Sequence, residues 1–441
     1  MYSMQWGPEA AMLRNDQRRQ LAQAKLHSDA GRTKRAITTY RQILRQAPEC
    51  TDAMFQLAVL LHDVGELEAA ANQLRIFLSY QPNLAEVHFN LGTILMALSR
   101  PEEASSSFLR AIELQPGFSD AHNNLGTCYR DQGQLQKALE CFEAALAQSP
   151  DSLHALINLG TTLAKCNRSI ESVAVCRRAL SLHPDSPDAH YALGIALEKT
   201  GAHHEAIDHL QIAVYSRPDV PEWQFHLAAS QGASPPTAPT EYVTSLFDGY
   251  AKRFDDHLVS DLKYMTPQHL YRAVRQFSNR SMDKALDLGC GTGLSGEVFR
   301  ETVRSFVGVD LSSEMIKVAQ ERHLYDELHV SEVTSFLEGR QSEYDLIVAA
   351  DVFVYIGDLA LIFSQASKAL RNNGLFAFSV EANESDSYVL GATRRYSHAL
   401  TYLRRLSAAN GFTERTADSV VLREDHGRDV QGWVVVLEKS E

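Results

Sequence analysis

The sequence lacks a basic excess and any long apolar run. Its 441 residues carry 42 Lys and Arg against 55 Asp and Glu, a formal net charge of −13. Proteins that bind nucleic acid or anionic membranes by general electrostatics need a basic surface, so we expect neither partner. No run of about 18 apolar residues is present to cross a bilayer. The first residues also lack the apolar core of a secretory signal.

Cysteine is scarce, and its spacing excludes the common metal motifs. None of the six cysteines forms a C-x-x-C pair or lies at a metal-ligand spacing from histidine. We therefore expect no metal site. Free thiols fit a reducing compartment, which predicts a cytoplasmic protein. The chain is long enough for two or three domains.

Proline recurs in the first half at a fixed interval. The prolines lie at residues 48, 82, 116, 150, 184 and 218, each 34 residues after the last. Asn-Leu-Gly recurs with the same period at 90–92, 124–126 and 158–160. Twelve residues before each proline lies an alanine, except in the fifth repeat, where Ser172 takes its place. A period of 34 is typical of helix-turn-helix tetratricopeptide (TPR) repeats. We predict an all-α solenoid of six repeats with a closing helix over 17–228, after a tail at 1–16.

Stacked repeats form a concave groove, and such arrays usually bind a protein or peptide. An amide recurs at one position of the first helix of four repeats, at Gln56, Asn90, Asn124 and Asn158. These amides could bind the backbone of an extended peptide partner, or could serve helix packing alone. The histidines of the array are expected to pack rather than to bind a ligand.

A glycine-rich loop dominates the second half. The segment Asp287-Leu-Gly-Cys-Gly-Thr-Gly293 follows the apolar run 285–288, and Asp310 ends a second apolar run at 306–309. A strand, a glycine turn, a helix and a strand with a terminal acid form half of a nucleotide-binding sheet. The carboxylate of Asp287 would repel a pyrophosphate and attract an ammonium or sulfonium. A dinucleotide domain therefore remains only as the competing interpretation.

The remaining pattern predicts an α/β domain over 281–441. Further apolar runs lie at 327–331, 344–350 and 375–381, with helical segments between them, and a last pair at 419–423 and 432–438 is separated by a polar turn. Alternating strands and helices favour a parallel sheet, and the last pair favours an antiparallel hairpin. We predict a Rossmann-like, seven-stranded, mostly parallel sheet.

The glycine loop resembles motif I of the class I S-adenosylmethionine-dependent methyltransferases. The whole chain resembles bacterial TPR-repeat methyltransferases, in which repeats precede a lid and this core. The matching segments are 250–255, 287–293, 308–312, 350–357, 378–381 and 395–398. The resemblance implies S-adenosyl-L-methionine as cofactor and in-line methyl transfer. It also implies a helical lid at 241–280. The residues before the lid are rich in proline, serine and alanine, which predicts a linker at 229–240.

The resemblance also distributes roles among the site residues. The methionine end of the cofactor would lie against Asp287, Asp351 and the glycine backbone, and the ribose against Asp310. The adenine would lie between Leu311 and the pair Glu332 and Val333. The full expected cofactor set is Asp287, Gly289, Gly291, Gly293, Asp310, Leu311, Glu332, Val333, Asp351 and Tyr250. Each acid could instead be a solvated charge at a strand end, and Tyr250 with Phe254 could pack on the sheet instead of covering the cofactor.

The acceptor side is less defined. The candidates are Tyr355, Glu381, Arg395, Tyr396 and His398. His398 could act as a base because its ordinary pKa is near neutrality, and Arg395 could hold a carboxylate or phosphate. The alternative is a surface helix that carries these side chains. Three hypotheses remain open: a small-molecule methyltransferase, a protein methyltransferase whose repeats hold the substrate, and a non-catalytic scaffold. The acceptor, the repeat partner and the oligomeric state are not given by the sequence.

Overall fold

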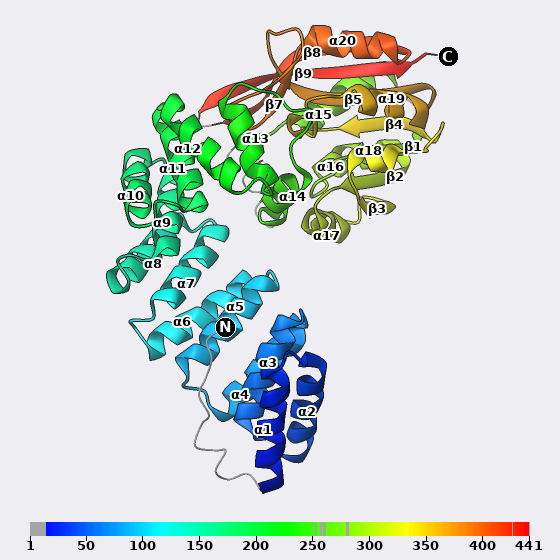
Figure 1. The fold of residues 1–441 in the computed structure, drawn as a ribbon. Helices are drawn as coiled ribbons and strands as arrows, with labels where there is room; N and C mark the ends of the chain where they lie inside the picture. The colour runs from blue at the N-terminus through cyan, green and yellow to red at the C-terminus, as the bar shows by residue number, and fades with distance from the viewer. Residues whose placement is uncertain are drawn as a thin grey trace. The chain divides into compact units, whose positions relative to one another are not determined.

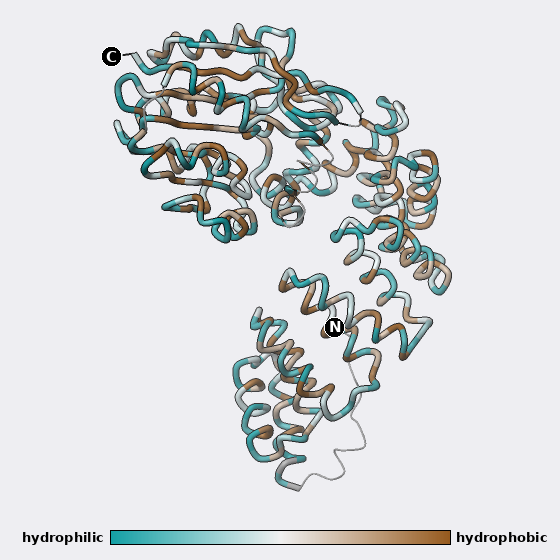
Figure 2. Tube along the Cα trace, turned by 180° about the vertical axis from the view of Figure 1, so that it is seen from behind, coloured by the Kyte–Doolittle hydropathy of each residue, from teal (hydrophilic) through white to brown (hydrophobic). Residues whose placement is uncertain are grey.

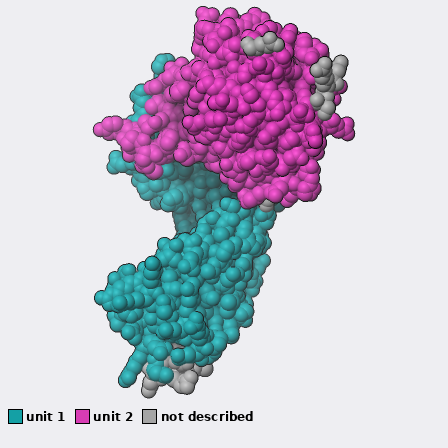
Figure 3. All heavy atoms as spheres, turned by 90° about the vertical axis from the view of Figure 1, so that its right-hand side faces the viewer, with its two compact units in different colours: residues 1–213 teal, residues 214–441 magenta. Residues whose placement is uncertain are grey.

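A computed structural model describes residues 15–251, 254–255, 258, 262–278, 282–425 and 427–440. The predicted tail at 1–16 lies outside this range except for its last two residues, and so does part of the predicted lid at 241–280. The chain divides into two compact units, residues 1–213 and 214–441, which Figure 3 colours separately. Each unit is described by itself.

The described part of the first unit is entirely helical and confirms the predicted TPR solenoid. Consecutive helices pair antiparallel, and each pair corresponds to one repeat (Figure 1). The helices are α1 (Asn15–Asp29), α2 (Thr33–Gln46), α3 (Thr51–Asp63), α4 (Leu67–Tyr80), α5 (Ala85–Ala97), α6 (Pro101–Leu114), α7 (Ser119–Asp131), α8 (Leu135–Gln148), α9 (Leu153–Lys165), α10 (Ser169–Leu182), α11 (Pro187–Thr200) and α12 (His203–Ser216), the last of which crosses into the second unit. No described helix has the length and apolarity needed to traverse a membrane.

The recurring glycine of Asn-Leu-Gly makes room for a large side chain on the second helix of its repeat. A Cβ built on Gly126 would lie 2.6 Å from the ring of Phe142, and one on Gly92 would lie 2.7 Å from Phe108. Both phenylalanines are fully buried. Glycine is therefore required at this position, because the backbone of the first helix lies in contact with the phenylalanine ring of the second helix.

Ser172, the departure in the fifth repeat, is accommodated by a hydrogen bond. Its side chain is fully buried and its Oγ donates to the carbonyl oxygen of Gly160 at 2.7 Å. A buried hydroxyl with a partner avoids the desolvation cost of an unpaired one. The substitution thus preserves the close packing of α9 and α10.

The periodic prolines are tied to the following repeat by a repeated side-chain contact. The Nε2 atoms of His88, His122 and His190 lie 2.9, 2.9 and 3.1 Å from the carbonyl oxygens of the prolines six residues earlier. In the last such turn, Gln224 donates to Pro218 at 2.8 Å. These histidines have a structural role, as the sequence predicted.

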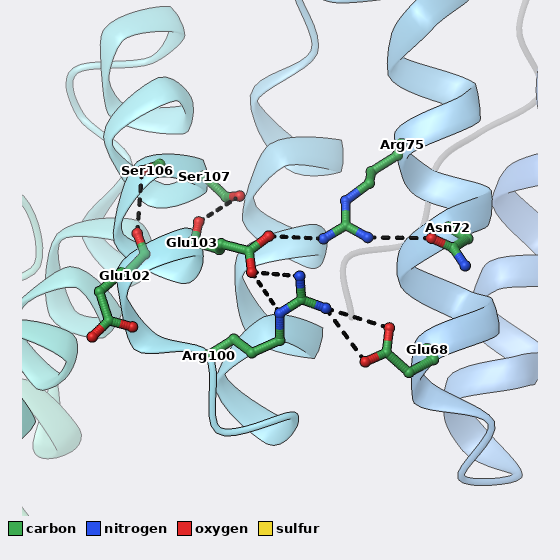
Figure 4. A network of polar contacts seen from close by, with 8 residues as sticks. All are labelled: Glu68, Asn72, Arg75, Arg100, Glu102, Glu103, Ser106 and Ser107. Atoms are coloured by element: carbon green, nitrogen blue, oxygen red, sulfur yellow. Dashed lines mark hydrogen bonds and ion pairs between the residues drawn. The ribbon is translucent and has the colours of Figure 1, made fainter. Parts of the chain in front are cut away.

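Ion pairs also connect neighbouring repeats on the solenoid surface. Arg75 of α4 pairs with Glu103 of α6 at 3.0 Å, and Arg100 reaches back to Glu68 at 3.3 Å (Figure 4). Arg75 also donates to Asn72. All of these side chains are at least a third exposed, so solvent screens each pair and its contribution to stability is small.

The second unit contains a nine-stranded sheet. Its order is β3-β2-β1-β4-β5-β7-β6, with β9 on β5 and β8 on β9. The strands are β1 (Met282–Leu288), β2 (Val303–Asp310), β3 (Glu327–Val330), β4 (Tyr344–Ala349), β5 (Leu370–Ala382), β6 (Tyr388–Leu390), β7 (Tyr396–His398), β8 (Phe412–Asp425) and β9 (Arg428–Lys439). Strands β1 to β5 are parallel, and the β8–β9 pair is antiparallel. The mostly parallel α/β fold is confirmed.

Helices cover both faces of this sheet, so its central strands are apolar on both sides. In β4, Leu346 and Val348 pack in the cluster that includes α15 (Thr266–Phe277). Ile347 and Ala349 pack in the cluster that includes α19 (Ala360–Ala369) and α20 (Leu400–Ala409). Figure 2 shows the same strands as continuous apolar segments. Smaller helices complete the unit: α13 (Pro221–Ser230), α14 (Thr240–Asp248), α16 (Leu294–Phe299), η4 (Arg300–Thr302), α17 (Ser313–Glu321), α18 (Val333–Leu337) and η5 (Phe353–Tyr355).

The sheet differs from the sequence prediction at its far edge. Nine described strands replace the predicted seven because β6 and β7, with three residues each, are too short to show a pattern. The last two strands are also longer than predicted. β8 begins at Phe412 rather than at 419, and its register shifts twice along β9, which interrupts the alternation that predicts a strand.

Part of the segment predicted as a linker at 229–240 is bonded to the loop after β4 in the second unit. The carbonyl oxygen of Pro236 accepts from the backbone N–H groups of Gly357 and Asp358, and Ala238 donates to the carbonyl oxygen of Tyr355 at 3.0 Å. We call residues 234–238 the strap. The helix α13, predicted to close the solenoid, lies within the second unit. Proline and serine composition predicted a linker because it does not reveal these backbone contacts.

Candidate functional site

The glycine loop lies between β1 and α16 at the carboxyl end of the parallel strands. Gly289, Gly291 and Gly293 have φ values of +65°, +54° and +101°, in the region that favours glycine. A Cβ on Gly289 would collide with Val352 at 2.4 Å, whereas one on Gly291 would meet only Phe254, at 3.7 Å. The backbone at Gly291 is therefore open to a ligand.

Asp310 ends β2 beside this loop. Its two carboxylate oxygens accept from the backbone N–H of Gly291 and of Ser312, both at 2.9 Å. A carboxylate has about four acceptor positions, so further hydrogen bonds from hydroxyl groups can be accepted. Burial raises the pKa of Asp310, while these backbone N–H groups oppose the shift. Strand β2 thus presents a rigidly held acceptor at the loop.

Asp287 is a fully buried acid at the start of the loop. Its Oδ2 accepts from the hydroxyl of Tyr325 at 2.7 Å, and its Oδ1 has no hydrogen-bond partner among the described residues. Burial raises its pKa to about 7. A buried carboxylate oxygen without a partner is costly unless a ligand provides a donor.

The described part of the lid folds onto the glycine loop. Asp248, at the end of α14, accepts from the hydroxyl of Ser312 at 2.5 Å, and Asp255 accepts from Thr292. The rings of Tyr250 and Phe254 lie 5.5 Å apart in an edge contact. Since Phe254 is the nearest neighbour of the open face of Gly291, the structure places it over the loop.

The residues expected around the adenine have mixed surroundings. Leu311 is half-buried directly after Asp310. Glu332 caps α18 and accepts from the backbone N–H of Ser335 at 2.8 Å. Burial raises the pKa of Glu332, but hydrogen bonds from Thr334 and Ser335 outweigh it and lower the net value. The side chain of Val333 packs in the core.

Asp351 follows β4 with a φ of +56°, an unusual backbone conformation for a non-glycine residue. Its backbone N–H donates to the Oγ of Ser379 at 2.9 Å, and that hydroxyl donates back to its Oδ1 at 2.8 Å. Its Oδ2 accepts from Arg423 at 3.1 Å. These contacts hold the strained residue in one orientation.

Arg423 joins Asp351, predicted at the methionine end of the cofactor, to Glu381, predicted on the acceptor side. It extends from β8, is 3% exposed, and pairs with both Asp351 and Glu381. Arg395 also approaches Glu381, with its Nη1 3.8 Å from Oε1, the oxygen that Arg423 contacts. Tyr355 is half-buried and its ring contacts Phe247 of α14 at 5.3 Å. The structure therefore brings together Asp351, Tyr355, Glu381 and Arg395.

Two residues of this site were missed by the sequence reasoning. Arg423 lies in a strand 72 residues from Asp351, and Tyr325 lies 38 residues from Asp287 in a segment predicted only as a connection. The one available signal for Arg423 was a charge directly after the apolar run 420–422.

The position of His398 argues against its predicted role as a base. The side chain is fully buried, and its Nε2 lies 3.1 and 3.0 Å from the carbonyl oxygens of Ile356 and Gly357. Burial lowers its pKa to about 4. It lies in β7 and not in a surface helix, so the alternative interpretation of this segment is also corrected. We assign His398 the role of fixing the loop after β4.

The predicted amide ladder of the solenoid is largely engaged in contacts within the solenoid. Asn90 is fully buried and cannot face a peptide. Asn158 donates to Asn123 at 3.0 Å and accepts from Arg130 at 2.9 Å, and Asn124 accepts from Asn123 at 3.2 Å. The prediction is wrong for Asn90, since the helix presents that position to the core. Gln56 is half-buried.

Comparison with known protein families agrees with both units. Residues 286–376 match the methyltransferase domain family. Residues 21–76, 63–117, 89–153 and 157–221 match the tetratricopeptide repeat family. The chain therefore carries TPR repeats followed by a methyltransferase domain.

Curated relatives match the second unit at low identity. The chain is 26% identical over 121 residues to the ubiquinone biosynthesis O-methyltransferase of Hydrogenovibrio crunogenus, which covers 26% of this chain and 50% of that protein. It is 28% identical over 149 residues to the malonyl-acyl-carrier-protein O-methyltransferase of Bacillus cytotoxicus, covering 32% and 47%. The chain spans about half the length of these relatives.

Two solved structures each match part of this chain. The pilus biogenesis factor PilW is 20% identical and matches 48% of this chain and 98% of its own, with a TM-score of 0.42. The YcgJ protein of Bacillus subtilis is 15% identical and matches 40% and 99%, with a TM-score of 0.33.

Proposed function

We propose that this protein is an S-adenosyl-L-methionine-dependent methyltransferase that acts on a small molecule, with the TPR solenoid as a protein- or peptide-binding module. One observation carries the cofactor assignment. A buried carboxylate oxygen of Asp287 without a partner lies next to the exposed glycine backbone and Asp310, at the carboxyl end of β1 and β2. Ligands of open α/β sheets bind at this edge.

The residues at this edge fit the proposed cofactor. Asp287 offers an acceptor to an ammonium group, and Asp310 offers free acceptor positions to a ribose diol. The open face of Gly291 permits close approach of a ligand to the backbone. The adenine would be bordered by Leu311, Glu332 and Val333. Because the side chain of Val333 is buried, Val333 would contact the adenine through its backbone. Asp351, Gly289, Gly293 and Tyr250 complete the proposed set.

S-adenosyl-L-methionine supplies a methyl group on a sulfonium centre, which is already a good leaving group. The protein then needs mainly to align the acceptor and to exclude water. The aromatic rings of the lid exclude water from the glycine loop, since Phe254 lies over Gly291. Tyr355, Glu381 and Arg395 lie on the acceptor side and would orient the acceptor. No residue is assigned as a general base.

The small-molecule assignment is supported by the names of the matched relatives. They include O-methyltransferases of ubiquinone biosynthesis, while one acts on a malonyl group attached to a carrier protein. A protein substrate recruited by the repeats and a non-catalytic scaffold remain the alternatives.

Cofactor binding is tested by calorimetry with S-adenosylmethionine. We expect Asp310→Ala to weaken binding by about 1.5–3 kcal/mol, the contribution of lost charge-assisted hydrogen bonds. Asp283→Ala is the matched control, because Asp283 is an exposed acid near the other end of β1. Unchanged affinity in Asp310→Ala would refute the ribose assignment.

The acceptor class is tested by labelled-methyl transfer in a native lysate. Label in the small-molecule fraction supports the proposal, and label in protein favours the first alternative. Any cofactor-dependent transfer excludes the scaffold.

A further inference from the structure

The two sides of the site differ in charge. On the cofactor side, Asp351 is paired with Arg423, but neither Asp287 nor Asp310 forms an ion pair with any residue that the structure describes. On the acceptor side, the guanidinium groups of Arg395 and Arg423 lie at the ends of β4 and β5. An uncompensated negative side favours a cation, whereas the other side offers positive donors.

Arg423 already engages Glu381 of the acceptor side and Asp351, which lies where the two sides meet. It binds Asp351 at 3.1 Å and also binds Oε1 of Glu381. With 3% of its side chain exposed, Arg423 is not accessible to a ligand. Its role is to neutralise and position these two acids.

Arg395 differs because its side chain is partly exposed, and besides its contact with Tyr355 it has a donor without a partner. Its Nη1 is buried and has no hydrogen-bond partner in the described part of the chain. The nearest acid oxygen, Oε1 of Glu381, is 3.8 Å away and already accepts from Arg423. The side chain as a whole remains 28% exposed. A buried guanidinium donor without a partner is costly, and a ligand oxygen would remove that cost.

The surroundings of Arg395 suit a small anion with an apolar body. The ring of Tyr355 lies beside it and packs against Phe247 of the lid at 5.3 Å. Arginine binds planar oxygen pairs of carboxylate and phosphate through two parallel hydrogen bonds. A cationic acceptor would be repelled by the same group.

We propose that the methyl acceptor is an anionic small molecule whose carboxylate or phosphate pairs with Arg395. This inference rests on the proposed function and adds the chemical class of the acceptor. Arg423 contributes indirectly, by occupying Glu381 so that Arg395 stays available.

The class is tested with full-length protein and labelled S-adenosylmethionine. The small-molecule pool of a lysate is separated on an anion exchanger at neutral pH, and each fraction is offered as acceptor. We expect transfer with the retained fraction, and transfer confined to the unretained fraction would overturn the inference. Phosphatase treatment of the retained fraction then separates the two sources: loss of acceptor activity indicates a phosphate, and its persistence indicates a carboxylate.

The residue is tested with Arg395→Gln and Arg395→Lys on the active fraction. We expect Arg395→Gln to lower kcat/KM by about 10- to 100-fold, mainly through KM, as the loss of a charged hydrogen bond implies. Arg395→Lys should restore part of the loss, because it retains the charge without the two-pronged geometry. Arg404→Gln, on the surface of α20, is the matched control. Equal kinetics for Arg395→Gln and Arg404→Gln would overturn the assignment.

Failure of the proposed function gives a different result. In that case the unmodified protein transfers no label to either fraction and shows no calorimetric binding of S-adenosylmethionine. Binding and transfer that do not depend on charge or on Arg395 would leave the function intact and reject only the anionic acceptor.

Discussion

The hydroxyl of Tyr325 donates to one oxygen of Asp287 at 2.7 Å, while the other oxygen of this buried acid has no partner among the described residues. This hydrogen bond fixes the orientation of the carboxylate and leaves its Oδ1 available to a ligand. Since the pKa of Asp287 is about 7, its charge changes near neutral pH.

The first prediction concerns the pH dependence of stability. The pKa of Asp287 is about 7 in the fold against an ordinary 3.8, so the fold binds this proton more tightly than the unfolded chain does. The associated stability is complete below the ordinary pKa and is lost as pH rises to the folded pKa. Asp287→Asn keeps an acceptor for Tyr325 but cannot ionise. As the pH rises from about 5 to about 8, the unfolding free energy of the unmodified protein should therefore fall by about 3 kcal/mol relative to that of Asp287→Asn. Urea denaturation without cofactor at the two pH values measures this difference, and a constant difference would contradict it.

The same acid predicts a pH dependence of binding. A cationic cofactor should bind more tightly as pH rises through about 7, because Asp287 then becomes ionised. Asp287→Asn should bind S-adenosylmethionine more weakly and with a flatter pH profile. Calorimetry across this range is the measurement, and parallel profiles for the two proteins would exclude a role for Asp287.

A matched pair of glycine variants separates folding from ligand access. Both glycines have positive φ, so alanine costs about 1 kcal/mol or more at either position. At Gly289 the new Cβ would also collide with Val352, whereas at Gly291 it would meet only Phe254, at an ordinary contact distance of 3.7 Å. We expect Gly289→Ala to lower Tm more, and Gly291→Ala to remain folded but to lose S-adenosylmethionine binding. Full binding by folded Gly291→Ala would contradict the location of the cofactor.

Removal of the buried arginine should destabilise the second unit. Arg423→Met leaves Asp351 and Glu381 without their shared partner, and an uncompensated buried charge typically costs about 3–5 kcal/mol. Adding Glu381→Gln should recover part of this loss, because one of the two acids is then neutral. Urea denaturation measures both, with Arg404→Met as a surface control expected to cost about 1 kcal/mol or less. Equal effects of Arg423→Met and Arg404→Met would show that the buried pairs contribute nothing.

The close packing of the solenoid gives a reciprocal test. Gly126→Ala would bring a Cβ to 2.6 Å from Phe142 and should destabilise the protein by about 1–3 kcal/mol, as overpacking does. Adding Phe142→Leu should recover part of that loss, because the second repeat pairs Ala58 with Leu74 at these two positions. Thermal unfolding of both single variants and the double variant measures the coupling, and simple additivity would contradict the proposed contact.

The strap predicts where the chain can be shortened. A protein that begins at Val214 keeps the bonds of the strap to Tyr355, Gly357 and Asp358, whereas one that begins at Glu241 loses them. We expect the shorter protein to have a lower Tm and weaker S-adenosylmethionine binding, since the loop after β4 carries Tyr355. Identical behaviour of the two proteins would mean that the strap is only a linker.

The sequence by itself determined the features that depend on short-range pattern. The interval of 34 between prolines identified the repeats, because each repeat buries the same face. The glycine spacing and the acids at 287, 310 and 351 identified the loop and the strand ends. A backbone with positive φ favours glycine, and the carboxyl end of a strand that binds a ligand carries polar residues, so both features can be recognised in a short segment of sequence. The resemblance of the motifs added the cofactor class.

Only the tertiary structure decided which distant side chains meet. It placed Arg423 between Asp351 and Glu381, set Tyr325 against Asp287, bonded the predicted linker to the loop after β4, and buried His398 and Asn90. These outcomes depend on the order in which strands pair and on which helix face meets the core. Neither is encoded by neighbours in the chain, so charge and burial at these positions follow from packing between residues far apart in sequence.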